Sequence, residues 1–247
     1  MKKTIITIVI TVILITVPGY FFLNMQLNRQ KEKADLEYLH SVEKSVQKQI
    51  KELSSRIFYQ VASLGNVIAA QQDFSLRILV ENDRSSPDIT EMASRYLKPM
   101  NFAVLDIADS SFTILSSGHF PASAGNSCRE KGSRLSSNTV ACPDNIMGTP
   151  KLTFQASSRF TIAGFKFYVM GGVVIDSTFL SDLTPGDNIS LLLKNGNEYT
   201  GTIAVQSISE ITGNHIIIDD RKYLAAVIEL PSSGLPHTLE LLLLVDK

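Results

Sequence analysis

The 247 residues include no tryptophan, only two cysteines and only four histidines. The net charge is also small, at −1. Because acidic and basic residues nearly cancel and no basic block occurs, nothing in the charge pattern favours nucleic-acid binding, which needs a positive surface. The length suits one ordinary domain plus an appendage, built around a single core. Nucleic acid is therefore excluded as a partner.

Charged residues are also absent from Thr4 to Asn28, and Thr4 to Leu23 consists almost wholly of Ile, Val, Leu, Thr and Phe. Twenty apolar residues in a helix span about 30 Å, the hydrocarbon thickness of a bilayer, so this segment predicts a transmembrane helix. A cleaved signal peptide is the alternative, but its apolar region has only about 7–15 residues and ends in a small-x-small site. Pro18-Gly19-Tyr20 supplies no such site.

Lys2 and Lys3 precede the apolar segment. By the positive-inside rule they keep the N-terminus in the cytoplasm, so residues after Asn28 are expected outside. We therefore expect residues 1–28 to form a cytoplasmic tip and an anchor in a bacterial inner membrane. The remainder of the chain is expected in the periplasm, with the lipid bilayer as one partner.

Cys128 and Cys142 lie in a polar stretch that predicts a loop. Two cysteines that close a short loop in an exported domain most often form a disulfide, which stabilises the fold by about 3 kcal/mol in the chain-entropy model. A metal site is the alternative, but no histidine or second cysteine pair lies nearby at ligand spacing. The sequence thus predicts a disulfide, no metal and no cofactor.

Residues 29–72 contain no proline and one glycine, and apolar residues recur there in steps of three and four from Leu39 to Ile68. This spacing predicts one long helix. Its narrow apolar stripe suits either a coiled-coil seam or a helix that lies against a sheet. We expect a membrane-proximal stalk that carries the signal, with homodimer pairing over its first half.

Shorter helices are predicted after the long one, and the hydrophobic period changes to two from Asn101 onward. Long helices followed by strands predict an α+β fold with an antiparallel sheet, here residues 73–247. The segments expected to be strands are 102–107, 112–115, 151–156, 159–162, 166–175, 189–193, 202–205, 215–219, 223–230 and 238–245.

Enzyme motifs are missing: the sequence has no GxSxG elbow, no HExxH and no phosphate-binding glycine loop. The paired Gly171-Gly172 lies inside an apolar strand, where it indicates a bulge or a close approach of two backbones rather than catalysis. We therefore expect no catalytic residues in this chain.

Two segments carry a resemblance to a known family. Residues 104–125, with Asp106, Ile114-Leu115-Ser116-Ser117 and His119, resemble a motif of membrane sensor histidine kinases of the nitrogen-regulation type, and Gly171 to Leu180 resembles a second one. The order of elements is similar to the extracytoplasmic CACHE or PDC sensor domains of bacterial receptors. The resemblance implies a PAS-like antiparallel sheet with covering helices, and a ligand pocket between the sheet and its covering loops.

The resemblance implies that inward-facing polar residues near strand ends bind the ligand. The candidates that fit this description are His119, Arg95, Tyr96, Arg159 and Tyr168. An arginine could bind a carboxylate through two hydrogen bonds, and His119 could donate or accept at the pocket edge. The amino-acid-binding motif Y-x-x-x-x-R-x-W-Y of some double-CACHE domains is missing, and Ser94-Arg95-Tyr96 matches it only in part, so the ligand stays open.

The sequence predicts the extracytoplasmic ligand-sensing portion of a transmembrane receptor, a two-component sensor histidine kinase whose kinase part would follow Lys247. A small molecule, such as a carboxylate or an amino acid, would be its ligand. The alternative is a single-span envelope assembly or protein-interaction factor that binds another protein and sends no signal inward.

Overall fold

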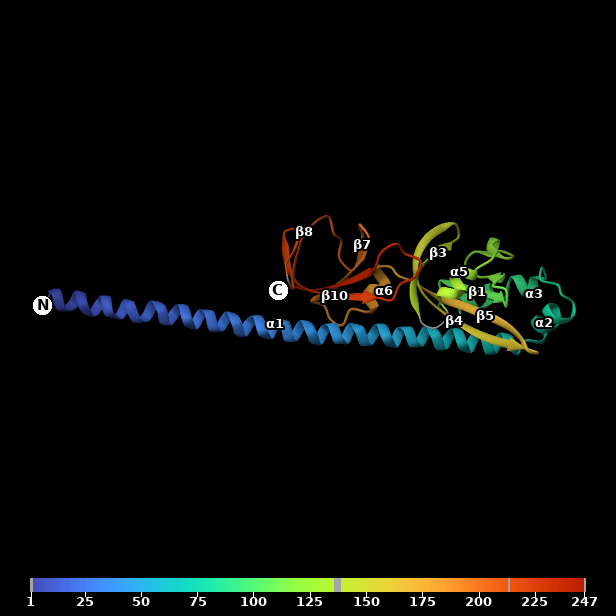
Figure 1. The fold of residues 1–247 in the computed structure, drawn as a ribbon, viewed down its shortest axis with the longest axis horizontal. Helices are drawn as coiled ribbons and strands as arrows, with labels where there is room; N and C mark the ends of the chain where they lie inside the picture. Colours follow the sequence, from blue (N-terminus) through green and yellow to red (C-terminus); the bar gives the residue numbers. More distant parts are fainter. Residues whose placement is uncertain (1, 136–138, 213, 247) are drawn as a thin grey trace.

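The computed structural model describes residues 2–135, 139–212 and 214–246, with side chains described for 20–135, 139–208 and 214–246 (Figure 1). The helices are α1 (Lys2–Ala69), α2 (Gln72–Ser75), the π-helical turn η1 (Leu76–Val80), α3 (Pro87–Thr90), α4 (Met92–Leu97), the 3₁₀ turn η2 (Pro121–Ser123), α5 (Arg129–Arg134) and α6 (Ser177–Asp182). The strands are β1 (Val104–Asp109), β2 (Ile114–Ser117), β3 (Val140–Ile146), β4 (Thr149–Ile162), β5 (Phe165–Val174), β6 (Ile189–Asn195), β7 (Glu198–Gly201), β8 (Ile208–Thr212), β9 (His215–Ile218), β10 (Arg221–Leu230) and β11 (Leu239–Val245).

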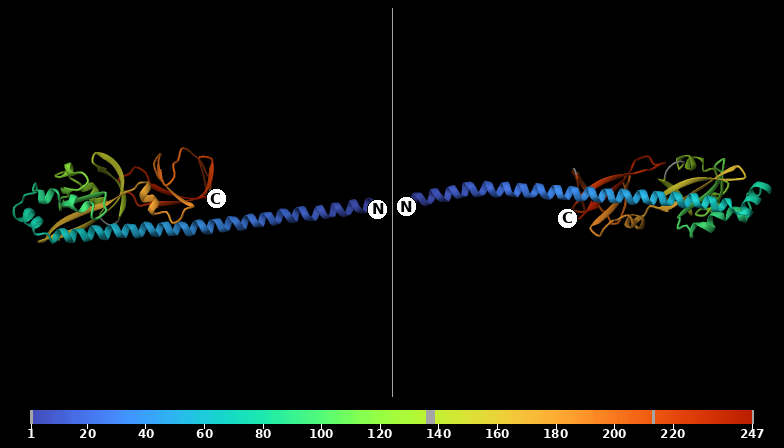
Figure 2. Two further views of the ribbon diagram at one scale, coloured as in Figure 1. Left: turned by 180° about the vertical axis from the view of Figure 1, so that it is seen from behind. Right: turned by 90° about the horizontal axis from the view of Figure 1, so that it is seen from below.

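The long helix α1 supports both sheets, which lie on the same side of it (Figures 1 and 2). Its predicted apolar stripe is buried from Leu39 to Val46 and from Ile57 to Ile68, and it is half-buried between these parts, at Ile50 and Leu53. Residues 20–34 are exposed, and α1 extends past the sheets toward the N-terminus. The expectation of a long helix laid against a sheet is therefore confirmed.

Two antiparallel sheets make up the rest of the fold. The sheet farther from the N-terminal end of α1, which we call the distal sheet, has the order β2-β1-β5-β4-β3 and packs on the C-terminal part of α1. The sheet nearer to that end, the proximal sheet, has the order β7-β6-β11-β10-β9-β8. The main hydrophobic core, formed by α1, α2 and one face of each sheet, runs through the molecule, and two smaller clusters lie apart from it. The predicted α+β class is therefore confirmed.

Among the side chains that the structure describes, which begin at Tyr20, no helix is long and apolar enough to cross a membrane. Most of the predicted span, Thr4 to Gly19, lies outside those described side chains, although its backbone continues α1.

Several element predictions need correction. The segment from Cys128 to Cys142 is not a plain loop, because it contains α5 and the start of β3. Strand β4 is continuous where two strands were expected, since its central Ser157 is buried within the sheet. The strand expected at 202–205 is wrong: the tight turn at Gly196 starts β7 at Glu198, and the strand ends at Gly201.

The glycine pair in β5 brings neighbouring backbones together, as predicted. A Cβ atom on Gly172 would lie 2.1 Å from the carbonyl oxygen of Phe154 and 2.9 Å from Cγ of Gln155. Glycine at this position therefore leaves the space that the Gln155 side chain occupies on the adjacent strand.

Candidate functional site

The two faces of the distal sheet differ in chemistry. Leu105 and Ile107 of β1 join the main core, whereas Asp106 between them points to the opposite face because side chains alternate along a strand. On β4, Thr153 and Gln155 lie on that opposite face, and both are fully buried. Helix α5 contributes Lys131, whose ammonium reaches the carboxylates on this face. Polar side chains are thus buried on the side of the sheet away from α1.

An ammonium group bridges two carboxylates at this place. Lys131 Nζ lies 2.6 Å from Asp106 Oδ2 and 2.6 Å from Asp144 Oδ2, the latter at the edge strand β3. Gln155 Nε2 also donates to Asp144 Oδ2, at 2.7 Å. The side chains of Asp106, Lys131 and Asp144 are 3%, 19% and 13% exposed. We call Asp106, His119, Lys131, Asp144 and Gln155 the polar cluster.

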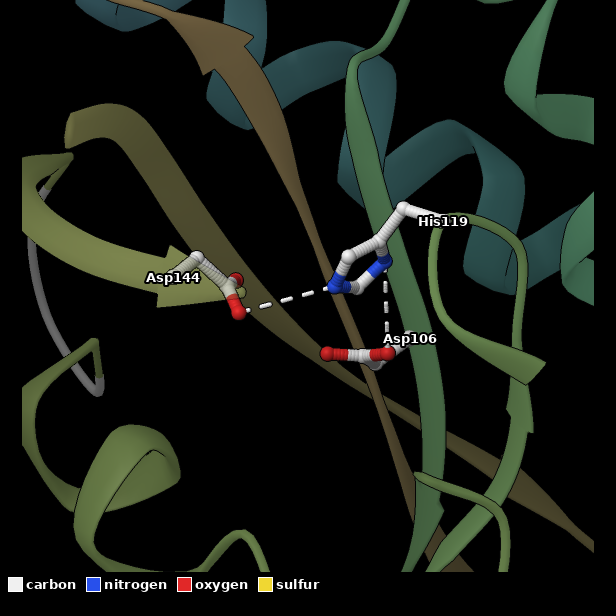
Figure 3. Close-up of side chains that lie close together, drawn as sticks. All are labelled: Asp106, His119 and Asp144. Carbon is white, nitrogen blue, oxygen red and sulfur yellow. Dashed lines mark ion pairs between the residues drawn. The ribbon is translucent and has the colours of Figure 1, made fainter. Parts of the chain in front are cut away.

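His119 completes the polar cluster from the segment after β2 (Figure 3). The backbone N–H of Leu105 donates to His119 Nδ1 at 3.2 Å, so this hydrogen bond assigns the ring proton to Nε2. Nε2 lies 3.5 Å from Asp144 Oδ1, and Nδ1 lies 3.7 Å from Asp106 Oδ1. The imidazole therefore stands between the two carboxylates.

The charges of the polar cluster stabilise each other. Burial alone would raise the pKa of the Asp144 carboxyl, but the hydrogen bond of His119 and the charge of Lys131 outweigh burial and hold that pKa well below its usual range. Burial would likewise lower the pKa of the Lys131 ammonium, but the charges of Asp106 and Asp144 raise it above its usual value. Lys131 and Asp144 are therefore both charged around neutral pH.

Two acceptor atoms of the polar cluster have no donor among the described residues. They are Asp106 Oδ1 and Gln155 Oε1, in residues that are 2% and 0% exposed. A buried polar atom without a partner costs about 1–3 kcal/mol, so such atoms are rare unless a ligand or a water molecule completes them. The polar cluster thus has unused capacity to accept hydrogen bonds.

Contacts with the β1–β2 hairpin fix α5 over the polar cluster. The backbone N–H of Cys128 donates to the carbonyl oxygen of Phe112 at 2.7 Å. Phe112 has φ of 62°, a left-handed conformation that bulky residues rarely adopt, and its ring stacks on Tyr168 with centroids 4.5 Å apart. A cavity of about 590 Å³ borders α5 and is lined by Ser127, Cys128, Arg129, Glu130, Lys131 and Arg134. Lys131 therefore connects this cavity with the buried carboxylates.

Ligand atoms of Asp106, His119 and Asp144 lie within 4.8 Å of one another, a spacing at which such groups could hold a metal ion. A histidine that binds a metal uses an imidazole nitrogen without a proton, and its other nitrogen donates a hydrogen bond. Here Nδ1 already accepts from Leu105, and Lys131 places a positive charge between the carboxylates. These residues fit an ammonium group better than a metal ion.

Of the residues predicted to bind ligand, only His119 belongs to the polar cluster. Arg95 lies on α4, half-exposed, with its guanidinium 3.6 Å from Asp88 and 3.8 Å from Glu91. The hydroxyl of Tyr96 accepts a hydrogen bond from Gln71. Helix α4 packs against β1 and β2 by way of the main core, so both residues are on the other side of the distal sheet.

Arg159 and Tyr168 form a third group. They are opposite each other on β4 and β5, where Arg159 is exposed and Tyr168 stacks on Phe112. No sequence pattern marked Lys131, Asp144 or Gln155 as a candidate. Only Asp106 carried a signal, as a charged residue within an otherwise apolar strand.

The disulfide predicted between Cys128 and Cys142 is not present in the structure, in which both residues are buried free thiols of one small apolar cluster. Each thiol has a contact of its own. Cys128 Sγ donates to the carbonyl oxygen of Phe112 at 3.1 Å, and Cys142 Sγ lies 4.0 Å from Thr153 Oγ1. The two side chains therefore act as packing residues beneath α5.

A larger cavity of about 670 Å³ lies elsewhere, between α1, α6 and the segment before β1. Glu52 and Arg56 of α1 line it, and both are exposed. Asp176 also lines it, but its carboxylate is engaged as the N-cap of α6, accepting from the backbone of Phe179. The polar cluster, with its buried charges, is the better candidate site.

No family model and no curated protein matches the chain. Solved structures do match. The periplasmic domain of Vibrio cholerae LuxQ shares 14% identity, covers 85% of this chain and 98% of its own length, and has a TM-score of 0.56. The sensor domain of the V. cholerae histidine kinase DctB shares 8% identity, with coverages of 88% and 99% and a TM-score of 0.52.

A chemoreceptor domain is similar as well. The sensory domain of Campylobacter jejuni Tlp3, solved with isoleucine bound, shares 11% identity, with coverages of 86% and 93% and a TM-score of 0.54. At such identities the likeness establishes the fold. The chain therefore has the fold of the periplasmic sensor domains of histidine kinases and chemoreceptors, which confirms the CACHE-like architecture predicted from its sequence.

Proposed function

We propose that this chain is the extracytoplasmic ligand-sensing part of a transmembrane signalling receptor. The observation that carries the proposal is the polar cluster: buried charges and two unpartnered acceptors lie beneath a short helix that borders a surface cavity. Such a site binds a small molecule by completing its hydrogen bonds. The Tlp3 domain of the same fold, solved with isoleucine, supports a small-molecule ligand.

The output is proposed to be a histidine kinase, on the strength of the two sequence segments that resemble such kinases. The chemoreceptor domain of the same fold makes a chemoreceptor output the competing choice. This chain itself is proposed to be non-catalytic.

Ligand binding would act on α1 through the distal sheet. One face of this sheet bears the polar cluster, and its other face packs on α1 through residues such as Phe154 and Phe160. A change at α5 that alters the strands would therefore alter how the sheet sits on α1. A ligand that favours one of two such arrangements shifts their populations and moves the helix.

We propose that residues 1–28 form a cytoplasmic tip and a membrane anchor, residues 29–72 a signalling helix, and residues 73–247 the periplasmic sensor. The first half of the signalling helix, in which residues 29–34 are exposed, would pair two copies in a homodimer. Alkaline phosphatase fused after Lys247 should be active in a bacterial host, and a reporter that works only in the cytoplasm should be silent there. The reverse pattern would overturn the topology.

A thermal-shift screen of amines, amino acids and carboxylates on the full chain in detergent tests ligand sensing. A ligand that binds only the folded state adds about 2.7 kcal/mol of stability at a hundredfold excess over its Kd. Asp106→Asn should abolish the shift, whereas Asp88→Asn, which alters an exposed carboxylate, should keep it. If no small molecule shifts the melting temperature and a protein partner binds instead, the envelope-assembly alternative replaces our proposal.

A further inference from the structure

We infer that the polar cluster is a binding site for a primary ammonium group, and that Lys131 fills it with its own ammonium in the unliganded protein. This inference rests on the proposed function, because it names the chemical class of ligand for the same site. The tethered ammonium and an ammonium-bearing ligand would therefore compete for the same acceptors.

The acceptors of the polar cluster select the class of ligand. Asp106 and Asp144 each give one carboxylate oxygen to Lys131 at 2.6 Å, and Asp106 Oδ1 and Gln155 Oε1 are buried without a donor. An ammonium has three N–H donors and a positive charge, so it can satisfy several of these atoms at once. An anionic ligand would meet two carboxylates, and an apolar ligand would leave all the acceptors unpaired.

The position of Lys131 makes its ammonium replaceable. It extends from α5, a helix of only six residues, and its side chain is 19% exposed at the cavity of about 590 Å³. A tethered group has a high effective concentration, so a simple amine should bind the wild-type protein weakly. A natural ligand must gain affinity from further contacts, and its entry would displace Lys131.

Displacement of Lys131 would also move α5. The N-terminal end of this helix is bonded to Phe112 through Cys128, and Phe112 stacks on Tyr168 of β5. Strand β5 contacts α1. Replacing an internal ammonium with an external one thus gives a physical route from the site to α1.

Chemical rescue of Lys131→Ala tests the inference. This substitution removes three methylene carbons and the ammonium, and n-propylammonium supplies the same atoms. We expect n-propylammonium to raise the Tm of the Lys131→Ala chain by several degrees and to bind it with a Kd at least tenfold lower than the wild-type value. If the variant does not fold alone, recovery of its β-sheet circular dichroism on adding the amine is the readout.

Matched control ligands and variants show whether the rescue requires both the N–H donors and the positive charge of the amine. Tetramethylammonium, which lacks N–H donors, and n-propanol, which lacks the charge, should not rescue, and the double variant Asp106→Asn/Lys131→Ala should lose rescue by n-propylammonium. Arg129→Ala, an exposed residue on the same helix and cavity, should respond as the wild type does. Absence of rescue, or rescue by Zn²⁺ and not by the amine, overturns the inference. A third outcome is that n-propylammonium rescues Lys131→Ala but no small molecule shifts the Tm of the wild-type chain. This outcome supports the ammonium site and contradicts only the proposed sensing function.

Discussion

The ring of Phe112 lies directly against the backbone of Gly132, so that a Cβ atom at position 132 would be only 2.2 Å from Phe112 Cε1. The ring has little room to move, because it stacks on Tyr168. Gly132 is therefore required for α5 to sit at its observed height above the polar cluster.

Gly132→Ala should destabilise the protein by about 1–3 kcal/mol through overpacking, although alanine is the better helix former. Urea unfolding of the variant measures this effect. Gly186→Ala is the matched control, since its added methyl would meet its nearest atom at 3.6 Å, an ordinary contact. Equal stability of both variants would contradict the close contact with Phe112, whereas Phe112→Leu in the Gly132→Ala background should restore part of the loss.

Asp106→Asn should cost about 3 kcal/mol of unfolding free energy, because it leaves the charge of Lys131 with one carboxylate fewer in a buried place. Asp88→Asn removes an exposed carboxylate that is 38% accessible, and surface pairs of this kind contribute at most about 1 kcal/mol. Chemical denaturation of both variants gives the comparison. Similar losses for the two would show that the buried bridge adds no more than a surface pair.

Stability should depend on acid through Asp144. Its carboxyl pKa is lower in the folded than in the unfolded chain, so its contribution is fully present above an unfolded pKa of about 4 and is lost as pH falls below that value. Thermal unfolding between pH 2 and pH 7, followed for wild type and Asp144→Asn, measures this loss. The variant should be less stable than the wild type at neutral pH, and its stability should fall less steeply as the pH is lowered. Parallel curves would place the acid sensitivity elsewhere.

The buried thiols should react slowly in the folded protein. Burial, aided by the charge of Asp106, raises the pKa of Cys128 to about 11, and burial raises that of Cys142 as well. Iodoacetamide at pH 8 should therefore modify neither cysteine quickly, and should modify both after unfolding without reductant, as judged by mass spectrometry. An unfolded chain that takes up no label would instead support the disulfide expected from the sequence.

The sequence predicted the parts of the fold that depend on local periodicity. The stripe from Leu39 to Ile68 predicted α1 correctly, because a helix that buries one face has apolar residues in steps of three and four, a pattern visible in the sequence alone. Strand β3 was missed because it contains Pro143 and the polar Asp144, which a strand tolerates at the edge of a sheet. Its edge position depends on pairing with β4, which local sequence does not encode.

The site was harder to predict than the fold, for the same reason. His119 was selected because it follows a strand within a recognisable motif, whereas Lys131 meets Asp106 across 25 residues and Asp144 across 13. A lysine in a polar segment predicts an exposed side chain, and only the folded position of α5 brings its ammonium to the carboxylates. Arg95 and Arg159 were plausible anion ligands by type. The distal sheet separates Arg95 from the polar cluster, whereas Arg159 is on the same face as Gln155 but four residues farther along β4, where it is exposed.

The continuity of α1 sets a rotational phase between its two ends. The helix has 68 residues and a length of about 100 Å, and each residue turns it by about 100°. One residue inserted among the exposed residues 20–34 would turn both sheets about the helix axis by that angle relative to the N-terminal segment, while seven would return them to within about 20° of the original direction. The output of the proposed receptor should therefore vary with insertion length in a cycle of about 3.6 residues, and an insertion of seven should come close to the original output.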